Sequence, residues 1–260
     1  MSELVRNERF DNGVVLLTLD RPPVNALATD LLRALDDAAE QLANDPTVKA
    51  VVVAGGGKHF AAGANIDEFV VGDPEANRPM IALFRRALDG LAAIPRPVIA
   101  AVNGFALGGG FELALACDLR IAADNARVGF PEILLGLIPG AGGTQRAARL
   151  VGPARAKELV WSGRQLGADE ALALGLIDRV VAKDELLERA LEWAGSFATG
   201  AVVAMGIAKT VIDVGVDQPL EDALDAEREA FLSTFATRDH EIGIASFREH
   251  GPGKAEFTGS

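Results

Sequence analysis

The chain has 260 residues, with 25 Lys and Arg against 37 Asp and Glu, so its net charge is −12. This balance disfavours a general role on nucleic acid or on an anionic membrane surface, and a hydrophobic content of 49% disfavours disorder. An anionic ligand would therefore need local donors and not a basic face.

The composition also indicates the cellular compartment. A single cysteine, Cys117, excludes an intrachain disulfide and any CxxC motif. The first 13 residues are rich in charge and lack the apolar stretch of a secretory signal. No apolar run approaches the ~18 residues of a membrane span. We expect a soluble, cytoplasmic protein.

Short apolar runs alternate with amphipathic stretches in the first half of the chain. Residues 14–19 form an apolar run that two prolines end, which predicts a strand. Thr29 precedes a stripe of apolar residues at helical spacing, which predicts a helix ending before residues 44–46. The alternation continues with expected strands at 50–54, 98–102 and 119–123 and expected helices at 80–94 and 111–117. This order favours an α/β fold with largely parallel strands.

Beyond Thr144 the pattern is mainly helical. We expect one strand, at 177–181. The expected helices cover residues 154–162, 168–174, 186–197, 201–214, 220–235 and 241–249. No Ser/Gly/Pro-rich linker precedes them, so we interpret the helical part as an extension of one unit, useful for covering the core or for assembly.

Several familiar sites are absent. Residues 55–58 lack the spacing of a GxxxxGK[ST] phosphate loop, and residues 140–143 lack the third glycine of GxGxxG. GxSxG and HExxH are also missing. The three histidines are far apart and are interpreted as solvated residues, so no metal site is expected. Trp161 and Trp193 are predicted core residues, and Cys117 a small buried hydrophobe.

Three glycine-rich segments follow expected strands. They span residues 55–67, 103–112 and 129–144. Glycines let the backbone approach a ligand closely and leave N–H groups free to donate. The second segment opens a helix, whose N-terminus suits a developing oxyanion. For the first segment alone, a plain flexible turn is an equally good explanation.

Two glutamates lie in these segments. Glu112 is in the first turn of the expected helix, where it could face a ligand or merely complement the helix dipole, and position alone favours the latter. Glu132 is the one charge in residues 128–144, so it is either solvated at a turn or held in a pocket. A carboxyl in apolar surroundings has a raised pKa and can transfer protons near neutral pH. The pair is therefore a candidate acid/base couple.

Together the segments resemble the crotonase family, the enoyl-CoA hydratases and their relatives, over essentially the whole chain. The resemblance is carried by residues 20–27 (DRPPVNAL), 60–66 (FAAGANI), 100–113 (AAVNGFALGGGFEL), 131–133 (PEI) and 139–144 (PGAGGT). It implies a spiral of ββα units, assigned to residues 1–195, and a C-terminal helical trimerisation region, assigned to 196–260. A homotrimer or homohexamer is expected.

The resemblance also implies roles for individual residues. The amides of Ala64 and Gly109 would form an oxyanion hole for the thioester carbonyl, each donor contributing roughly 10²–10³ in rate. Glu112 would activate the water that attacks the β-carbon, and Glu132 would give a proton to the α-carbon. Their separation in sequence, 132 − 112 = 20, is that of the family.

Further residues are implied in binding coenzyme A (CoA), which is part of the substrate, so no separate cofactor is expected. The backbone around Ala62 and Ile66 would receive the adenine, and the amide of Gly140 would help to position the water. Asn65 replaces the Asp of many relatives. This replacement should alter the local structure more than the reaction. The candidates for contacting the CoA phosphates are Lys58, Arg248 and Lys254.

The leading prediction is a hydratase that adds water in syn fashion to a trans-2-enoyl-CoA, giving a 3-hydroxyacyl-CoA. The alternatives are double-bond isomerisation, thioester hydrolysis, or a non-catalytic acyl-CoA-binding protein. Isomerases of this family usually lack one of the two glutamates, so the presence of both favours hydration. Acyl-chain length is left open.

Overall fold

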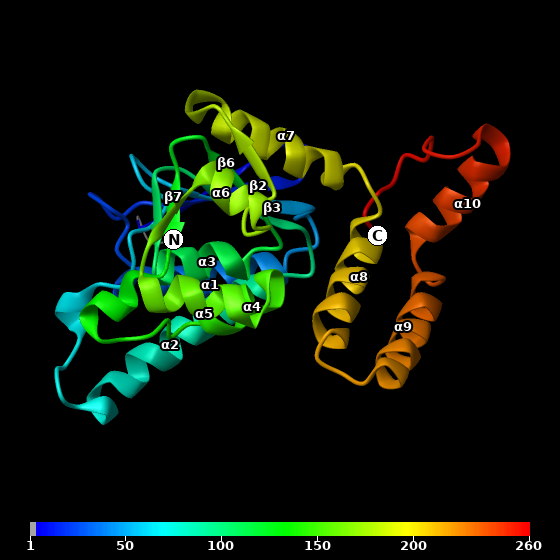
Figure 1. Ribbon diagram of the computed structural model, residues 1–260. Helices are drawn as coiled ribbons and strands as arrows, with labels where there is room; N and C mark the ends of the chain where they lie inside the picture. Colours follow the sequence, from blue (N-terminus) through cyan, green and yellow to red (C-terminus); the bar gives the residue numbers. More distant parts are fainter. Residues whose placement is uncertain (1–3) are drawn as a thin grey trace.

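The computed structural model describes residues 4–260, in which the larger of two sheets has the strand order β1-β2-β3-β4-β6-β9 (Figure 1). These strands are β1 (Val5–Arg9), β2 (Val14–Leu19), β3 (Ala50–Gly55), β4 (Val98–Val102), β6 (Leu119–Ala123) and β9 (Arg179–Val181). Only the β1–β2 pair of this sheet is antiparallel. The expected α/β class with largely parallel strands is confirmed, whereas β1, rich in polar residues, was not predicted.

The ten helices of the described residues surround and extend this sheet. They are α1 (Thr29–Ala43), α2 (Pro74–Ala92), α3 (Gly109–Ala116), α4 (Gly143–Val151), α5 (Pro153–Ser162), α6 (Ala168–Ala173), α7 (Leu186–Ala198), α8 (Val202–Gly215), α9 (Leu220–Thr234) and α10 (Arg238–His250). Three 3-10 turns are η1 (Ile66–Glu68), η2 (Pro131–Leu135) and η3 (Lys183–Glu185). All the predicted helices are present, with shifted ends, and α4 was missed.

Helices cover both faces of the sheet, which is why its central strands are apolar throughout. All five residues of β4 are buried. Alternate residues of each strand point to opposite faces, so Val51 and Val53 join the core with α1 to α3, while Val52 joins α7. Trp193 of α7 lies in this second cluster, as predicted.

Trp161 was wrongly predicted as a core residue. The residue is 69% exposed, because the buried face of α5 is formed by Ala156, Leu159 and Val160. The next position along a helix is rotated by about 100°, which turns Trp161 away from the core. Apolar neighbours in sequence do not by themselves define a buried helix face.

A second, three-stranded sheet lies beside the glycine-rich segments. Its strands are β5 (Phe105–Leu107), β7 (Arg127–Gly129) and β8 (Gln165–Gly167). β5 pairs parallel with β7, and β7 pairs antiparallel with β8. The alternation in these three strands is too short to predict them, and β8 makes the expectation of a single strand after Thr144 wrong.

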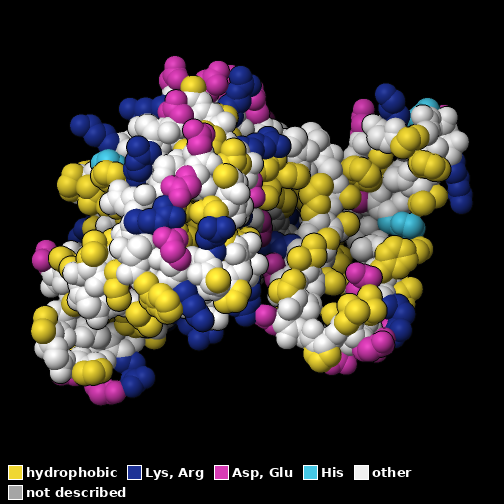
Figure 2. Space-filling view, viewed as in Figure 1, with side chains coloured by type: hydrophobic (Ala, Val, Ile, Leu, Met, Phe, Trp, Pro, Cys, Tyr) yellow, Lys and Arg dark blue, Asp and Glu magenta, His cyan; other side chains and the backbone are white. Residues whose placement is uncertain are grey.

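Helices α8, α9 and α10 stand beside the rest of the molecule, connected through α7 (Figure 1). Lys209 of α8 ties them to the main body, because its ammonium donates to the carbonyl of Ile94 at 2.9 Å and to Asp118 at 3.0 Å. No residue of α9 is buried, and Figure 2 shows apolar side chains on these helices. The division at residues 195 and 196 stays a prediction.

Within residues 4–260, no single helix has the length and apolar composition to span a membrane. The helical stretch of residues 183–198 taken together with α8 passes such a test by length and composition only, and it is bent by 101°.

Candidate active site

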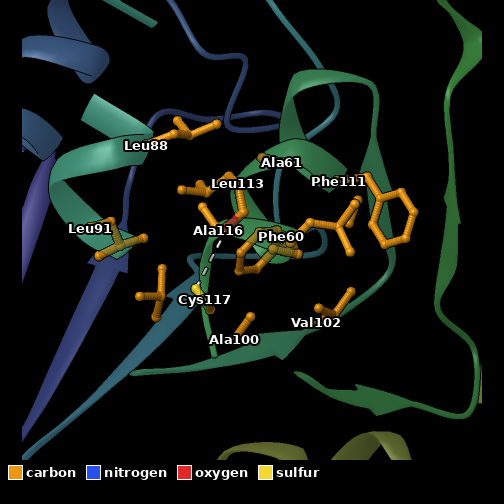
Figure 3. Packing of buried hydrophobic residues seen from close by; sticks show 14 of the residues in the cluster. Phe60, Ala61, Leu88, Leu91, Ala100, Val102, Phe111, Leu113, Ala116 and Cys117 are labelled. Carbon is orange, nitrogen blue, oxygen red and sulfur yellow. Dashed lines mark hydrogen bonds between the residues drawn. The ribbon is translucent and has the colours of Figure 1, made fainter. Parts of the chain in front are cut away.

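Helix α3 lies inside the core. Every residue from Gly109 to Ala116 is buried. Figure 3 shows Phe111 and Leu113 of this helix among Phe60, Val102 and other apolar side chains. Cys117, which follows it, is buried as predicted, and burial raises the pKa of its thiol to about 12.

Glycines allow the start of α3 to approach its neighbours. Gly108 precedes the helix with φ of 53°, a left-handed conformation that favours glycine, and its N–H donates to the carbonyl of Gly129 at 2.9 Å. A Cβ on Gly110 would lie 2.0 Å from the carbonyl oxygen of Ala61. The first and second glycine-rich segments therefore touch here.

Glu112 projects from α3 into a cradle of backbone amides. Only 3% of the residue is exposed, and its Oε1 accepts hydrogen bonds from the N–H groups of Ala141 (2.8 Å) and Gly143 (2.7 Å). Burial raises its pKa, while these two amides and the charge of Arg146 act against the rise. The carboxyl is thus buried, yet supplied with donors that favour its ionised form.

Glu132 lies at the start of η2, opposite the N-terminus of α3. Its Oε2 is buried and has no hydrogen-bond partner among residues 4–260. Its Oε1 would be 2.8 Å from a Cβ on Gly108, so the carboxyl lies against that glycine. Burial, reinforced by the negative charge of Glu112, raises the pKa of Glu132 to about 7. The two predicted glutamates are brought together at one site.

The amides of Ala64 and Gly109 are free to donate. Gly109 is the first residue of α3, and a first helical N–H has no acceptor within its helix. Ala64 pairs with Leu27 through bonds of its neighbours, from Leu27 to the carbonyl of Gly63 and from Asn65 to the carbonyl of Leu27. Its own N–H therefore faces away from Leu27. Neither amide has an acceptor within the part of the chain that the structure describes.

The remaining predicted residues are spread over a larger area. Ala62 donates its N–H to the carbonyl of Val24 at 3.0 Å, and Ile66 is half exposed. A Cβ on Gly140 would meet nothing within 4 Å, so open space adjoins it, beside the cradle of Glu112.

The three basic candidates are not gathered at the glutamates. Lys58 is exposed on the loop after β3. Arg248 belongs to α10, which lies far from α3 beyond α8 and α9, and Lys254 follows it (Figure 1). Within one chain, the C-terminal pair is remote from the glutamates.

Sequence reasoning missed several supporting residues. The donors of Ala141 and Gly143 to Glu112 were not identified, although residues 139–144 were part of the resemblance and the amide of Gly140 was assigned to the water; glycine at the start of the unrecognised helix α4 was the available signal. His59 is more than a solvated residue, since its ring stacks on Phe105 at 4.5 Å and its Nδ1 accepts the N–H of Phe105.

Comparison with known proteins agrees with this geometry. The enoyl-CoA hydratase/isomerase family matches residues 9–259. A short-chain-enoyl-CoA hydratase of Clostridium acetobutylicum is 42% identical over 92% of both chains, and a crotonyl-CoA hydratase of Syntrophomonas wolfei is 41% identical over 92% of this chain and 93% of its own. An enoyl-CoA hydratase structure from Bacillus anthracis superposes with a TM-score of 0.93 at 37% identity, covering 99% of this chain and 100% of the other. The expected crotonase fold is thereby confirmed, and the chain belongs to the enoyl-CoA hydratase/isomerase family.

Proposed function

We propose that the protein is an enoyl-CoA hydratase, a hydro-lyase that adds water in syn fashion to a trans-2-enoyl-CoA to give the 3-hydroxyacyl-CoA. One observation carries the proposal: at the N-terminus of α3 the buried carboxyl of Glu112, which accepts two backbone N–H groups, meets the carboxyl of Glu132, whose buried Oε2 has no hydrogen-bond partner among residues 4–260. The two environments favour different protonation states. Donors favour the carboxylate form of Glu112, which suits a base, and their absence favours the carboxylic acid form of Glu132, which suits an acid.

In the proposed reaction, Glu112 accepts a proton from water as the water oxygen bonds to the β-carbon. The electrons of the double bond move toward the thioester carbonyl, and the amides of Ala64 and Gly109 stabilise the enolate oxygen. Glu132 then gives its proton to the α-carbon. The net change is addition of one water, and proton transfer back between the glutamates through a further water restores their starting states.

The rest of the substrate would be bound by residues around this centre. The backbone at Ala62 and Ile66 is proposed to receive the adenine, and the amide of Gly140 to orient the water. CoA belongs to the substrate, so no separate cofactor is required. The proposed contacts to its phosphates are Lys58, Arg248 and Lys254.

We further propose a cytoplasmic homotrimer or homohexamer. Apolar side chains exposed on α8, α9 and α10 support assembly, because large exposed apolar patches are typical of interaction surfaces. The most exposed of those on these helices or directly after them are Ile212, Val216, Leu220, Phe231, Leu232, Phe235 and Phe247.

The test is hydration of crotonyl-CoA, followed by loss of the absorbance of the conjugated enoyl thioester, and then of longer enoyl-CoAs. We expect wild type to be active, and Glu112→Gln and Glu132→Gln each to lower kcat by roughly 10²–10⁴-fold, the usual contribution of a general acid or base. A wild type that hydrates none of these substrates would refute the function. Full activity in either Gln variant would refute its assigned role. Release of free CoA thiol would indicate hydrolysis instead.

A further inference from the structure

A carboxylate bridges the loop that carries Ala64 to the N-terminus of α1. Glu68 Oε2 accepts hydrogen bonds from both the N–H (2.9 Å) and the hydroxyl (2.6 Å) of Thr29, the first residue of α1. Glu68 Oε1 accepts a bond from the amide of Asn65 at 3.3 Å. One side chain thus joins the residue next to Ala64 to a helix that begins two residues after Leu27.

The Glu68 carboxylate lies where a negative charge is favoured, at the N-terminus of α1. The N-terminus of a helix has unpaired N–H groups and a positive dipole end, so a carboxylate is favoured there. The residue before Thr29, Ala28, has no side chain that could cap α1. Burial opposes ionisation of Glu68, but the bonds from Thr29 and Asn65 and the charge of Arg21 outweigh it and lower its pKa. Glu68 is therefore an ionised acceptor at neutral pH.

Packing holds the loop on one side only, because Ala64 lies against the main core. No residue of η1 (Ile66–Glu68) is buried, although η1 follows Ala64 almost directly. The polar links on its two sides are the Leu27 pairing and the Glu68 bridge. Because a displacement of about 1 Å in an active site can cost 10²-fold in rate, what holds Ala64 matters for catalysis.

We infer that Glu68 is a positioning residue, which holds the N–H of Ala64 in the oxyanion hole by anchoring its loop to Thr29. The inference rests on the proposed function of that amide. Asn65, where many relatives have Asp, takes part as a neutral donor to Glu68. A bond of 3.3 Å is long, so most of the anchoring comes from Thr29.

The test uses Glu68→Ala, which removes the bridge, and Glu68→Gln, which keeps an acceptor oxygen for Thr29. We expect Glu68→Ala to lower kcat for crotonyl-CoA about 10-fold, less than the loss of a whole oxyanion donor. Glu68→Gln should recover most of that loss. Thr29→Val, a milder change that keeps the backbone N–H, should lower kcat about 3-fold.

Asp45 provides a matched control at the other end of α1. Its Oδ1 accepts the N–H (2.8 Å) and hydroxyl (2.6 Å) of Thr47, the same pair of groups that Thr29 offers to Glu68. The 15 residues of α1 place it on the order of 20 Å away. Asp45→Ala should therefore leave kcat at the wild-type value.

A spectrum separates positioning from general loss of folded protein. The absorbance of cinnamoyl-CoA moves to longer wavelength when its carbonyl accepts hydrogen bonds, and the wavelength of the bound form does not depend on how much protein is folded. We expect the shift to shrink in Glu68→Ala and to return in Glu68→Gln. A full wild-type shift with full kcat in Glu68→Ala would overturn the inference. A wild type that shifts cinnamoyl-CoA but hydrates no enoyl-CoA would refute the proposed function, and the variant spectra would still decide the role of Glu68.

Discussion

Glu112 is carried by α3, whose residues are all buried, whereas Glu132 is carried by η2, in which no residue is buried. The first carboxyl receives two backbone hydrogen bonds, and the second has a buried oxygen without a partner among residues 4–260. The two elements are thus opposite in burial and in hydrogen bonding, although their glutamates meet at one place.

The difference indicates how one site can hold a base and an acid of the same residue type. Donors that point at Glu112 stabilise its negative charge inside the protein. Oε2 of Glu132 receives no hydrogen bond from residues 4–260, and a pKa raised to about 7 keeps this carboxyl largely protonated below neutral pH. We therefore expect substitutions next to Glu112 to lower kcat strongly and substitutions next to Glu132 to lower it less.

The largest effect among variants that leave both glutamates in place is expected from Gly143→Ala. A Cβ there would lie 2.7 Å from the ring of Phe130 and 2.9 Å from Cγ of Glu112, and neither has room to move in the core. We expect kcat to fall about 100-fold, because the carboxyl and its donor are displaced together. Steady-state kinetics with crotonyl-CoA checks this. The control is Gly90→Ala in α2, whose Cβ would make only ordinary contacts, at 3.7 Å or more.

Gly108→Ala perturbs the surroundings of Glu132. Its Cβ would lie 2.8 Å from Oε1 of Glu132, and the backbone conformation, with φ of 53° and ψ of −126°, adds strain of about 1–3 kcal/mol. Because η2 is not packed in the core, we expect it to yield and kcat to fall only about 10-fold. A larger loss than in Gly143→Ala would break the proposed contrast between the two sides.

A smaller effect is expected in stability. A carboxyl whose pKa is raised to about 7 holds its proton longer in the folded than in the unfolded protein, so its contribution is full below the unfolded pKa and is lost as pH rises through 7. Glu132→Gln should therefore be more stable than wild type at pH 8 by about 1–2 kcal/mol, a value reduced for partial exposure, and nearly equal at pH 5. Urea unfolding at both pH values measures this. Glu112→Gln should gain less, because it loses charge-assisted bonds.

The sequence predicted the parts of this molecule that have strong periodicity. The strand at 14–19 and the helix from Thr29 match the structure, because an element with a buried face has apolar residues at regular spacing. The short strands β5, β7 and β8 and the exposed first turns of α2 carry no such pattern. Their positions depend on contacts between distant segments.

Only part of the site was predicted, because the rest also depends on contacts between distant segments. Glu112 and Glu132 each had a structural explanation as good as a functional one, and only the resemblance of three segments joined them. The amide cradle and the Glu68 bridge could not be derived, because they link residues about 30 to 40 positions apart. Charge in an apolar stretch did identify Glu132, whose Oε2 is buried without a hydrogen-bond partner among residues 4–260.

The pH dependence of kcat/KM for crotonyl-CoA tests most directly whether Glu112 acts as base and Glu132 as acid. We expect a bell-shaped pH profile, with a rising limb above the usual carboxyl range from the raised pKa of Glu112 and a falling limb near pH 7 as Glu132 loses its proton. The two limbs belong to the coupled pair, and the residual activity of Glu132→Gln should lack the falling limb. A wild-type profile that stays level from pH 6 to pH 9 would contradict the assignment.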